Sequence, residues 1–350
     1  MSESGSIVAE TAARIFADLA DPQAVNSAKD DAWKGKLWQA LTEAGLTLAW
    51  VPEENGGAGA ELADGFAILG VAGRYAAAVP LAETLLAGRL LSRAGLKAPD
   101  GAMSVAPTRP GDKIMLNADG TLSGQARSVP FAKEARHLAV LAGSSVALVE
   151  TAACRLSEGL NLANEPSNTV TFDHVKPLAL APAPQGLNPP ALMLMGCVVR
   201  SVETAGALEA ILEMTVRYAN ERVAFERPIA KFQAVQHNLA RLAGEVSAAM
   251  TAAYSAADAI ARADKFDDAV FLEATAAKIR SAEAAQEGAA IAHQVHGAIG
   301  FTSEHILHRY TLRMLSWRDD FGNESYWAAA LGNRIASRGA DEFWPLVAAC

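Results

Sequence analysis

The stretch ERVAFERPIAKFQ, residues 221–233, separates two alanine-rich segments whose apolar residues recur at helical spacing. A plain connection between two helices needs only a polar turn, whereas this one carries two arginines, two phenylalanines, a proline and a glutamine. The segment that follows places Phe232, Val235, Leu239 and Leu242 on one face, which predicts a long amphipathic helix. The stretch therefore has a task besides turning the chain.

Helical patterns extend in both directions from this stretch. Pro189 and Pro190 suit the first turn of the helix that leads into it, since proline there sacrifices no hydrogen bond. Alanine-rich segments at 267–295 and 322–337 complete four expected helices. Small side chains let such helices approach closely, which is typical of a bundle.

Three regions of different character follow one another along the chain. Residues 1–101 have mostly helical patterning, interrupted at 51–62 by VPEENGGAGAEL, where a proline and three glycines break regular structure. Residues 102–184 contain short apolar runs between turns, and NADG at 117–120 predicts a hairpin. The predicted fold is mainly α: an N-terminal helical domain, a middle β barrel or sheet domain, and a C-terminal four-helix bundle over 185–350.

Composition narrows the classes of function. The net charge of −9 argues against a nucleic-acid surface, which is normally basic. The three cysteines, Cys154, Cys197 and Cys350, form no close pair and favour reduced thiols. The N-terminus lacks a secretion signal, and the apolar run at 191–199 is too short to cross a bilayer. We therefore expect a cytoplasmic protein without a membrane span.

Three motifs in register resemble the acyl-CoA dehydrogenase family. AGLTLAWVPEENGGAG (44–59) resembles its N-terminal "GL…PEEyGGaG" signature, ERVAFERPIAKFQ its "R-x-x-FG-x-x-I-x-x-x-Q" segment, and QVHGAIGFTSEH (294–305) its "Q-x-x-GG-x-G-[FY]" loop. The resemblance covers nearly the whole chain. It implies an acyl-CoA substrate, FAD as cofactor, and an oligomer in which one subunit contacts the FAD of its neighbour.

The resemblance assigns FAD contacts to seven residues. An arginine can bind a diphosphate with charge-assisted hydrogen bonds, and a glycine-rich loop lets the backbone approach adenosine. Ala298 departs from the family pattern, which has glycine there. The residues expected to contact FAD are Arg222, Phe225, Gln233, Gln294, Val295, Gly297 and Ala298.

The catalytic base that the family requires is missing. Removal of the α proton of the thioester needs a carboxylate, usually the glutamate of an "E-G-T" motif. In WRDDFGNESYW (317–327), Gly322 matches the glycine of that motif, so Phe321 takes the place of the glutamate. The alternative position of the base in this family falls on Gly196. We therefore expect no catalytic residue, although Asp320, one residue away, has suitable chemistry.

The predicted β domain also lacks family motifs. Where the family has "TEP-x-x-GSD" and "W-[IV]-[TS]-N", this chain has MSVAPTRPGDKIML (103–116) and ARSVPFAKEARHL (126–138). The pattern resembles the shorter, non-catalytic subunits of heteromeric α2β2 acyl-CoA dehydrogenases. Two alternatives stay open: a homomeric enzyme that uses Asp320 or another carboxylate, and a helical scaffold without activity.

Two histidine pairs suggest a metal site. His293 and His296, like His305 and His308, are three residues apart and could meet one ion. No carboxylate or cysteine has obvious ligand spacing beyond Glu304, and the family needs no metal. We therefore expect no metal ion.

Overall fold

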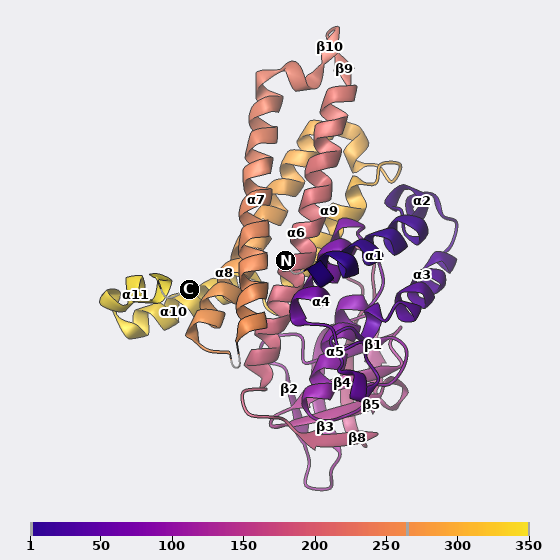
Figure 1. Ribbon diagram of the computed structural model, residues 1–350, viewed down its shortest axis with the longest axis vertical. Helices are drawn as coiled ribbons and strands as arrows, with labels where there is room; N and C mark the ends of the chain where they lie inside the picture. The colour runs from indigo at the N-terminus through magenta and orange to yellow at the C-terminus, as the bar shows by residue number, and fades with distance from the viewer. Residues whose placement is uncertain (1–2, 264–265, 349–350) are drawn as a thin grey trace.

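The computed structural model describes residues 3–263 and 266–348 (Figure 1). The N-terminal region is helical, as predicted, and the turn at 51–62 contains one short 3₁₀ turn, η2 (Glu53–Asn55). Another 3₁₀ turn, η1 (Leu46–Leu48), follows the third helix. The helices of this region are α1 (Glu3–Leu19), α2 (Pro22–Ser27), α3 (Ala32–Glu43), α4 (Leu62–Arg74) and α5 (Leu81–Arg93).

The middle region folds into two four-stranded sheets. One has the order β1-β4-β5-β8 and the other β2-β3-β7-β6, and NADG forms the predicted turn between the antiparallel strands β2 and β3. A 3₁₀ turn, η3 (Thr151–Ala153), precedes β6. The strands are β1 (Met103–Ala106), β2 (Lys113–Leu116), β3 (Leu122–Pro130), β4 (His137–Ala142), β5 (Ser145–Glu150), β6 (Arg155–Ser157), β7 (Ser167–Val175) and β8 (Ala179–Pro182).

The first sheet is buried on both faces. On β4, Leu138 and Val140 belong to the core between the two sheets, whereas Ala139 and Leu141 belong to the core shared with the N-terminal helices. Side chains alternate across a strand, so one strand joins two cores. The β domain is thereby fixed to the helices above it.

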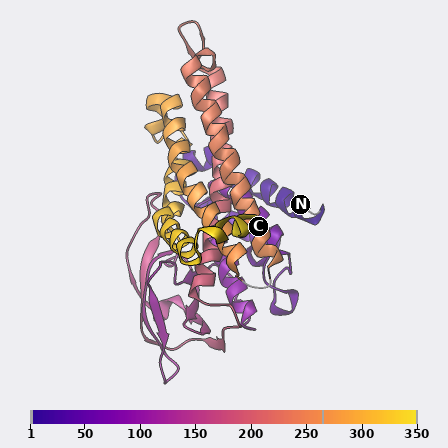
Figure 2. The same cartoon turned by 90° about the vertical axis from the view of Figure 1, so that its left-hand side faces the viewer.

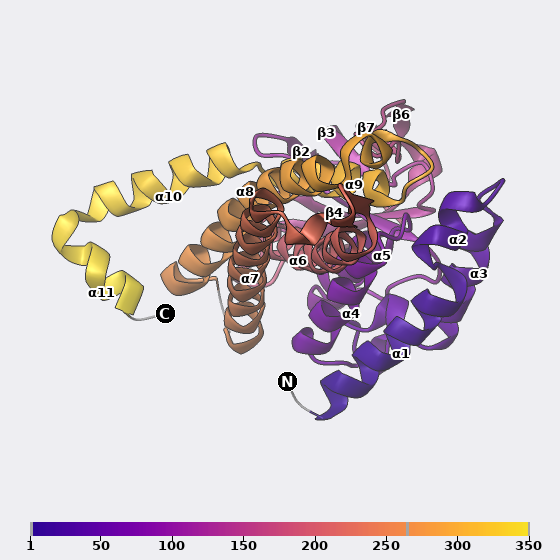
Figure 3. The same ribbon diagram turned by 90° about the horizontal axis from the view of Figure 1, so that it is seen from above.

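The C-terminal region is a helical bundle with an arm. Helices α6, α7, α8 and α9 run alongside one another, and α10 and α11 extend away from them (Figures 1 and 3). Helix α9 was not predicted, so the expected set of four bundle helices is corrected: α9 completes the bundle, and the segment at 322–337 belongs to the arm. The helices are α6 (Pro189–Glu221), α7 (Gln233–Arg262), α8 (Asp268–His296), α9 (Leu307–Asp319), α10 (Glu324–Arg338) and α11 (Phe343–Ala348).

Helix α6 is the central element. By length and composition it could cross a membrane, but its most apolar window is wholly buried inside the protein. Its apolar surface is therefore explained by packing against the neighbouring helices. It meets α4 at close range: a Cβ atom on Gly206 would lie 2.0 Å from the carbonyl oxygen of Gly70. Glycine at this crossing lets the N-terminal helices sit directly on the bundle.

The predicted domain boundaries lie in connections. Residues 101–102 fall between α5 and β1, and residues 184–185 fall between β8 and α6. We propose to keep these positions as the domain limits. The fold class itself, mainly α with a middle β domain, is as predicted.

Candidate functional site

The stretch 221–233 forms an exposed hairpin at the tip of the bundle. Strands β9 (Val223–Ala224) and β10 (Arg227–Pro228) pair there, followed by the 3₁₀ turn η4 (Ile229–Lys231). The hairpin projects beyond the other helices (Figure 2). Arg222 and Gln233 are exposed, and Phe225 is 89% exposed. The Phe225 ring therefore lies outside the cores and can contact another molecule.

The tip of this hairpin has an unfavourable backbone. Phe225 and Glu226 both have positive φ, 52° and 67°. Glycine adopts this left-handed region most readily, and other residues do so at a cost. The guanidinium carbon of Arg227 lies 4.3 Å from the centre of the Phe232 ring, which braces the base of the hairpin.

The second motif lies at the same end of the bundle. Helix α8 ends at His296 and continues into the 3₁₀ turn η5 (Gly297–Phe301). An open groove between α8, η5 and α9 is lined by Gln294, Gly297 and Ala298, and these three residues are exposed. Val295, in contrast, is buried in the bundle core, so its side chain does not reach the groove.

Stacked histidines support this groove. His293 stacks on Phe301 with ring centres 4.4 Å apart, and its Nε2 lies 3.0 Å from the Thr311 hydroxyl. His296 stacks on Tyr218 of α6 at 4.5 Å. Burial is the main cause that lowers the pKa of His296, to about 4. Neutral imidazoles can pack in this way without introducing a buried charge.

These histidines do not form a metal site with carboxylates or cysteines. Over residues 3–263 and 266–348, no group of three or more His, Cys, Asp or Glu side chains is placed to hold a metal ion. His296 and His305 have ring centres 4.7 Å apart. Their surroundings are aromatic, because Tyr218 packs against both rings.

Toward the start of α6, two positions face each other, and these are the positions where the family places its base. Phe321 is fully buried. A Cβ atom built on Gly196 would lie 2.2 Å from two carbons of the Phe321 ring. The phenyl ring therefore occupies the space that any side chain at position 196 would need, and neither position offers a proton acceptor.

The backbone of Phe321 is held from three sides. Its N–H donates to the carbonyl oxygen of Thr108 at 3.1 Å, which ties it to the β domain. Its carbonyl accepts from the indole Nε1 of Trp327 at 2.9 Å and from the Cys197 thiol at 3.2 Å. Phe321 has a φ of 56°, and Gly322 has a φ of 90°. This left-handed pair directs the ring inward after α9 ends.

Asp320 is engaged in a buried ion cluster. Its carboxylate accepts from Arg200 Nε at 3.0 Å, and the same guanidinium binds Glu203 at 2.7 Å and also Glu83. Lys278 donates to the carbonyl oxygen of Asp320 at 2.8 Å. Burial raises the pKa of Glu203 to about 7. The carboxylate of Asp320 is thus one of three that share the buried guanidinium of Arg200.

Sequence reasoning did not anticipate Arg200 and Lys278. Both are buried charges within apolar helical stretches. A charged residue in such a position must be paired or hydrogen-bonded, so that pattern could have revealed a buried cluster.

A large pocket lies between the β domain and the bundle, and its lining includes Pro107, Arg109, Asp112 and Trp327. Two of its charged groups are engaged within the protein. Arg109 donates from Nη1 to the carbonyl oxygen of Asp319 at 2.5 Å. The Asp112 carboxylate accepts from Arg127 Nε at 2.6 Å. Pro107 and Pro110 have no N–H to offer.

Family models match most of the chain. Residues 2–98 match the N-terminal domain of acyl-CoA dehydrogenases, and residues 193–341 match the C-terminal domain. The chain belongs to the acyl-CoA dehydrogenase family. Members of this family and its solved structures bind FAD, and the family comprises flavoprotein oxidoreductases of lipid metabolism.

Relatives along the whole length support this assignment. The acyl-CoA dehydrogenase IpdE2 of Mycobacterium tuberculosis (strain ATCC 25618 / H37Rv) is 30% identical, covering 89% of this chain and 91% of that protein. The Tcur3481–Tcur3483 steroid acyl-CoA dehydrogenase (G363A variant) has a TM-score of 0.83 at 27% identity, over 96% of this chain and 98% of that chain. The ChsE4–ChsE5 complex of Mycobacterium tuberculosis shares the fold, with a TM-score of 0.85 at 23% identity over 97% and 99%.

The exposed end of the bundle and the pocket beside the β domain differ in the groups that they offer to FAD. The exposed end of the bundle offers a free guanidinium, an aromatic ring, amide groups and a glycine turn, which fit a diphosphate and an adenosine. The pocket beside the β domain offers a flavin fewer free groups, because its Arg109 and Asp112 side chains are bound within the protein.

Proposed function

We propose that this chain is the non-catalytic subunit of a heteromeric acyl-CoA dehydrogenase. The complex desaturates an acyl-CoA thioester at its α and β carbons, and a homologous partner subunit supplies the base and holds most of the FAD. An assembly with two copies of each chain, as the resemblance implies, is part of the proposal, as is a cytoplasmic location.

The observation that carries the proposal is the contact between Phe321 and Gly196. A dehydrogenase that abstracts the α proton needs a carboxylate beside the flavin. Both positions where this family places one are filled by a phenyl ring packed on a glycine. Reopening that space requires a change at Phe321, because no side chain fits at Gly196 while the ring is there.

The exposed end of the bundle would complete the FAD site of the partner. Arg222 would bind the diphosphate, since an exposed guanidinium forms charge-assisted hydrogen bonds with phosphate oxygens. Phe225 would pack on the cofactor, and the backbone of the η5 turn would approach the adenosine. The residues in this role are Arg222, Phe225, Gln233, Gln294, Val295 through its backbone, Gly297 and Ala298.

Two similar structures favour a heteromer. One is a complex of two proteins, ChsE4 and ChsE5, and the other pairs Tcur3481 with Tcur3483 in a steroid acyl-CoA dehydrogenase. We infer that the partner is a homologous chain that carries the catalytic glutamate. A CoA thioester of a steroid-derived acid is the first substrate to assay.

The visible spectrum of the purified protein tests this proposal. The chain would be purified alone and after co-expression with a homologous chain from the same genome that retains the glutamate. We expect a colourless chain alone and a yellow, active complex with a flavin absorbance near that of one FAD per pair of chains.

Other spectra would identify the alternatives. A yellow and active preparation of the chain alone would show a self-sufficient homomeric enzyme. A chain that never increases the flavin content of any homologous partner would show a scaffold. Either result would overturn the proposal.

A further inference from the structure

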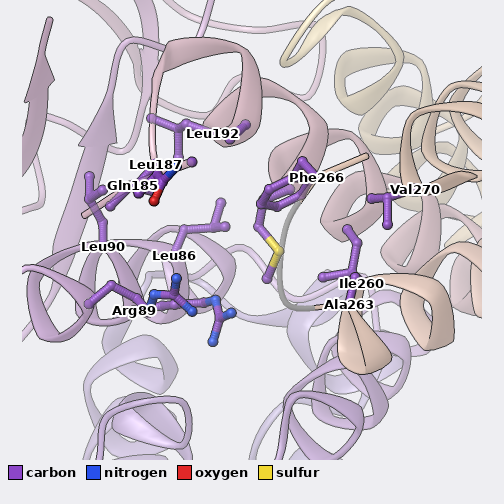
Figure 4. Close-up of a pocket in the computed structure, with 14 residues that line it drawn as sticks. Leu86, Arg89, Leu90, Gln185, Leu187, Leu192, Ile260, Ala263, Phe266 and Val270 are labelled. Atoms are coloured by element: carbon purple, nitrogen blue, oxygen red, sulfur yellow. The ribbon is translucent and has the colours of Figure 1, made fainter. Parts of the chain in front are cut away.

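A separate cavity lies where α5 meets α6, the end of α7 and the start of α8 (Figure 4). The space between these elements, with the open solvent at its mouth included, is about 680 Å³. Neither Gly196 nor Phe321 lines it. The cavity is therefore distinct from the filled position of the base.

Most of its wall is apolar. Leu86 and Leu90 of α5 lie on one side, and Ile260, Phe266 and Val270 lie on the other (Figure 4). The first turns of α6 close the remaining side with Leu192 and Met195. Such a lining favours the aliphatic or alicyclic body of a ligand.

Two arginines interrupt this apolar wall. Arg89 and Arg93 are four residues apart on α5, so they share one face of the helix, and both line the cavity. Burial, together with the charge of Arg93, lowers the pKa of Arg89 to about 10. The cavity thus holds two like charges against an apolar surface, an arrangement that an anion would stabilise.

Three other partly or fully buried arginines have carboxylate partners. Arg200 binds three carboxylates, Arg313 binds Glu165, and Arg280 binds Glu245. In the part of the chain that the structure describes, the side chains of Arg89 and Arg93 have no ion pair and no hydrogen bond. The two guanidinium groups that line the cavity therefore have no carboxylate partner among the described residues.

We propose that this cavity binds an amphipathic carboxylic acid, with its carboxylate on Arg89 and Arg93 and its apolar body against Leu192, Met195 and Phe266. The planar guanidinium matches the two oxygens of a carboxylate. The ligand is a free acid, because a thioester has no charge at the acyl carbonyl to pair with the arginines.

Such a ligand would connect parts of the chain that are distant in sequence. Its binding would stabilise the contact between the N-terminal helices and the bundle, since a ligand that binds only the folded state raises stability. This site does not depend on the proposed role in FAD binding, and its test uses no flavin.

Calorimetric titration with octanoate and with 1-octanol tests the proposal. The two probes have the same chain length and differ in charge. We expect octanoate to bind the purified protein, alone or in its complex, at least ten times more tightly than octanol. Arg89→Met removes the charge and keeps an unbranched apolar side chain, so octanoate binding should weaken at least tenfold while octanol binding stays within twofold.

Two further variants complete the design. Arg93→Met, at a more exposed position, should also weaken octanoate binding, and it replaces Arg89→Met if that variant fails to fold by circular dichroism. Arg155→Met, on the exposed strand β6, is the matched control and should bind octanoate normally. Equal affinity for the two probes, no binding of octanoate, or unchanged binding by the folded arginine variants would overturn the proposal.

Discussion

The two ends of helix α6 treat their functional positions in opposite ways. Near its start, Gly196 is covered by the fully buried ring of Phe321. At its end, Arg222 and Phe225 stand exposed on a hairpin beyond the bundle. In the first region the chain's own side chains fill the space, whereas in the second the side chains are exposed to solvent.

Under the proposed function, this contrast divides proton abstraction and FAD binding between two chains. A buried aromatic contact improves stability but cannot accept a proton, whereas exposed binding residues stabilise nothing until their ligand arrives. Variants of the two regions should therefore differ in their effects on stability, flavin binding and turnover. The predictions below run from the largest expected effect to the smallest.

Phe321→Ala should cause the largest loss of stability. Truncation of a fully buried phenylalanine typically costs about 3–5 kcal/mol, because it removes buried surface and leaves a cavity. Gly196→Ala alone should also destabilise the protein, since its Cβ would overlap the Phe321 ring. Chemical denaturation of the two single variants and the double variant measures the coupling. In the Phe321→Ala background, Gly196→Ala should cost less than about 1 kcal/mol. Additive losses would show that the two positions do not share this space.

Stability should fall as the solution becomes acidic. The pKa of His296 is lowered by burial to about 4, from 6.5, so the folded state keeps a neutral imidazole that the unfolded chain protonates. Its contribution is fully present above pH 6.5 and is lost between pH 6.5 and about 4, by at most ~3 kcal/mol. Denaturation across this window should show a weaker pH dependence for His296→Gln. The exposed control His237→Gln should follow the parent protein, and an identical slope for His296→Gln would contradict the assignment.

Arg222→Ala should weaken FAD binding by the complex and leave the fold intact. Loss of a charge-assisted bond to phosphate should reduce affinity by about 1.5–3 kcal/mol. Loss of a surface arginine should change the free energy of unfolding by less than about 0.5 kcal/mol. FAD titration of the co-purified complex gives the first value, and thermal denaturation checks the second. Arg217→Ala, exposed on the same helix, is the control, and equal flavin affinity in the two variants would remove Arg222 from the site.

Local patterns in the sequence were sufficient for much of the fold. The NADG turn and the proline start of α6 depend on neighbouring residues, and both are present. Helix α9 was not predicted because its inward face carries Arg313. An arginine is normally assigned to the surface, so it interrupts the apolar pattern of the helix. That arginine is buried against Glu165, a partner 148 residues away. A pairing over such a distance leaves no local periodicity.

The candidate site shows the same difference between features set by neighbouring residues and features set by contacts between residues distant in sequence. Alignment of motifs placed Phe321 and Gly196 at the two base positions, but their mutual contact depends on packing between α6 and the end of α9. Nothing in the local sequence indicated that the Asp320 carboxylate has a partner, because that partner, Arg200, lies 120 residues earlier. The seven expected FAD contacts stay predictions, and the burial of the Val295 side chain leaves only its backbone for that role.

Asp320→Asn tests the central claim most directly, since the account gives this chain no base. The substitution keeps the size of the side chain and removes its basicity, and turnover would be measured in the reconstituted complex at saturating FAD. Asp319→Asn, at the adjacent position, is the matched control. The account predicts that the Asp320→Asn complex keeps more than about a tenth of its turnover, because a positioned general base is worth about 10²–10⁴-fold. A loss of about a thousandfold with flavin still bound would show that this chain performs its own proton abstraction.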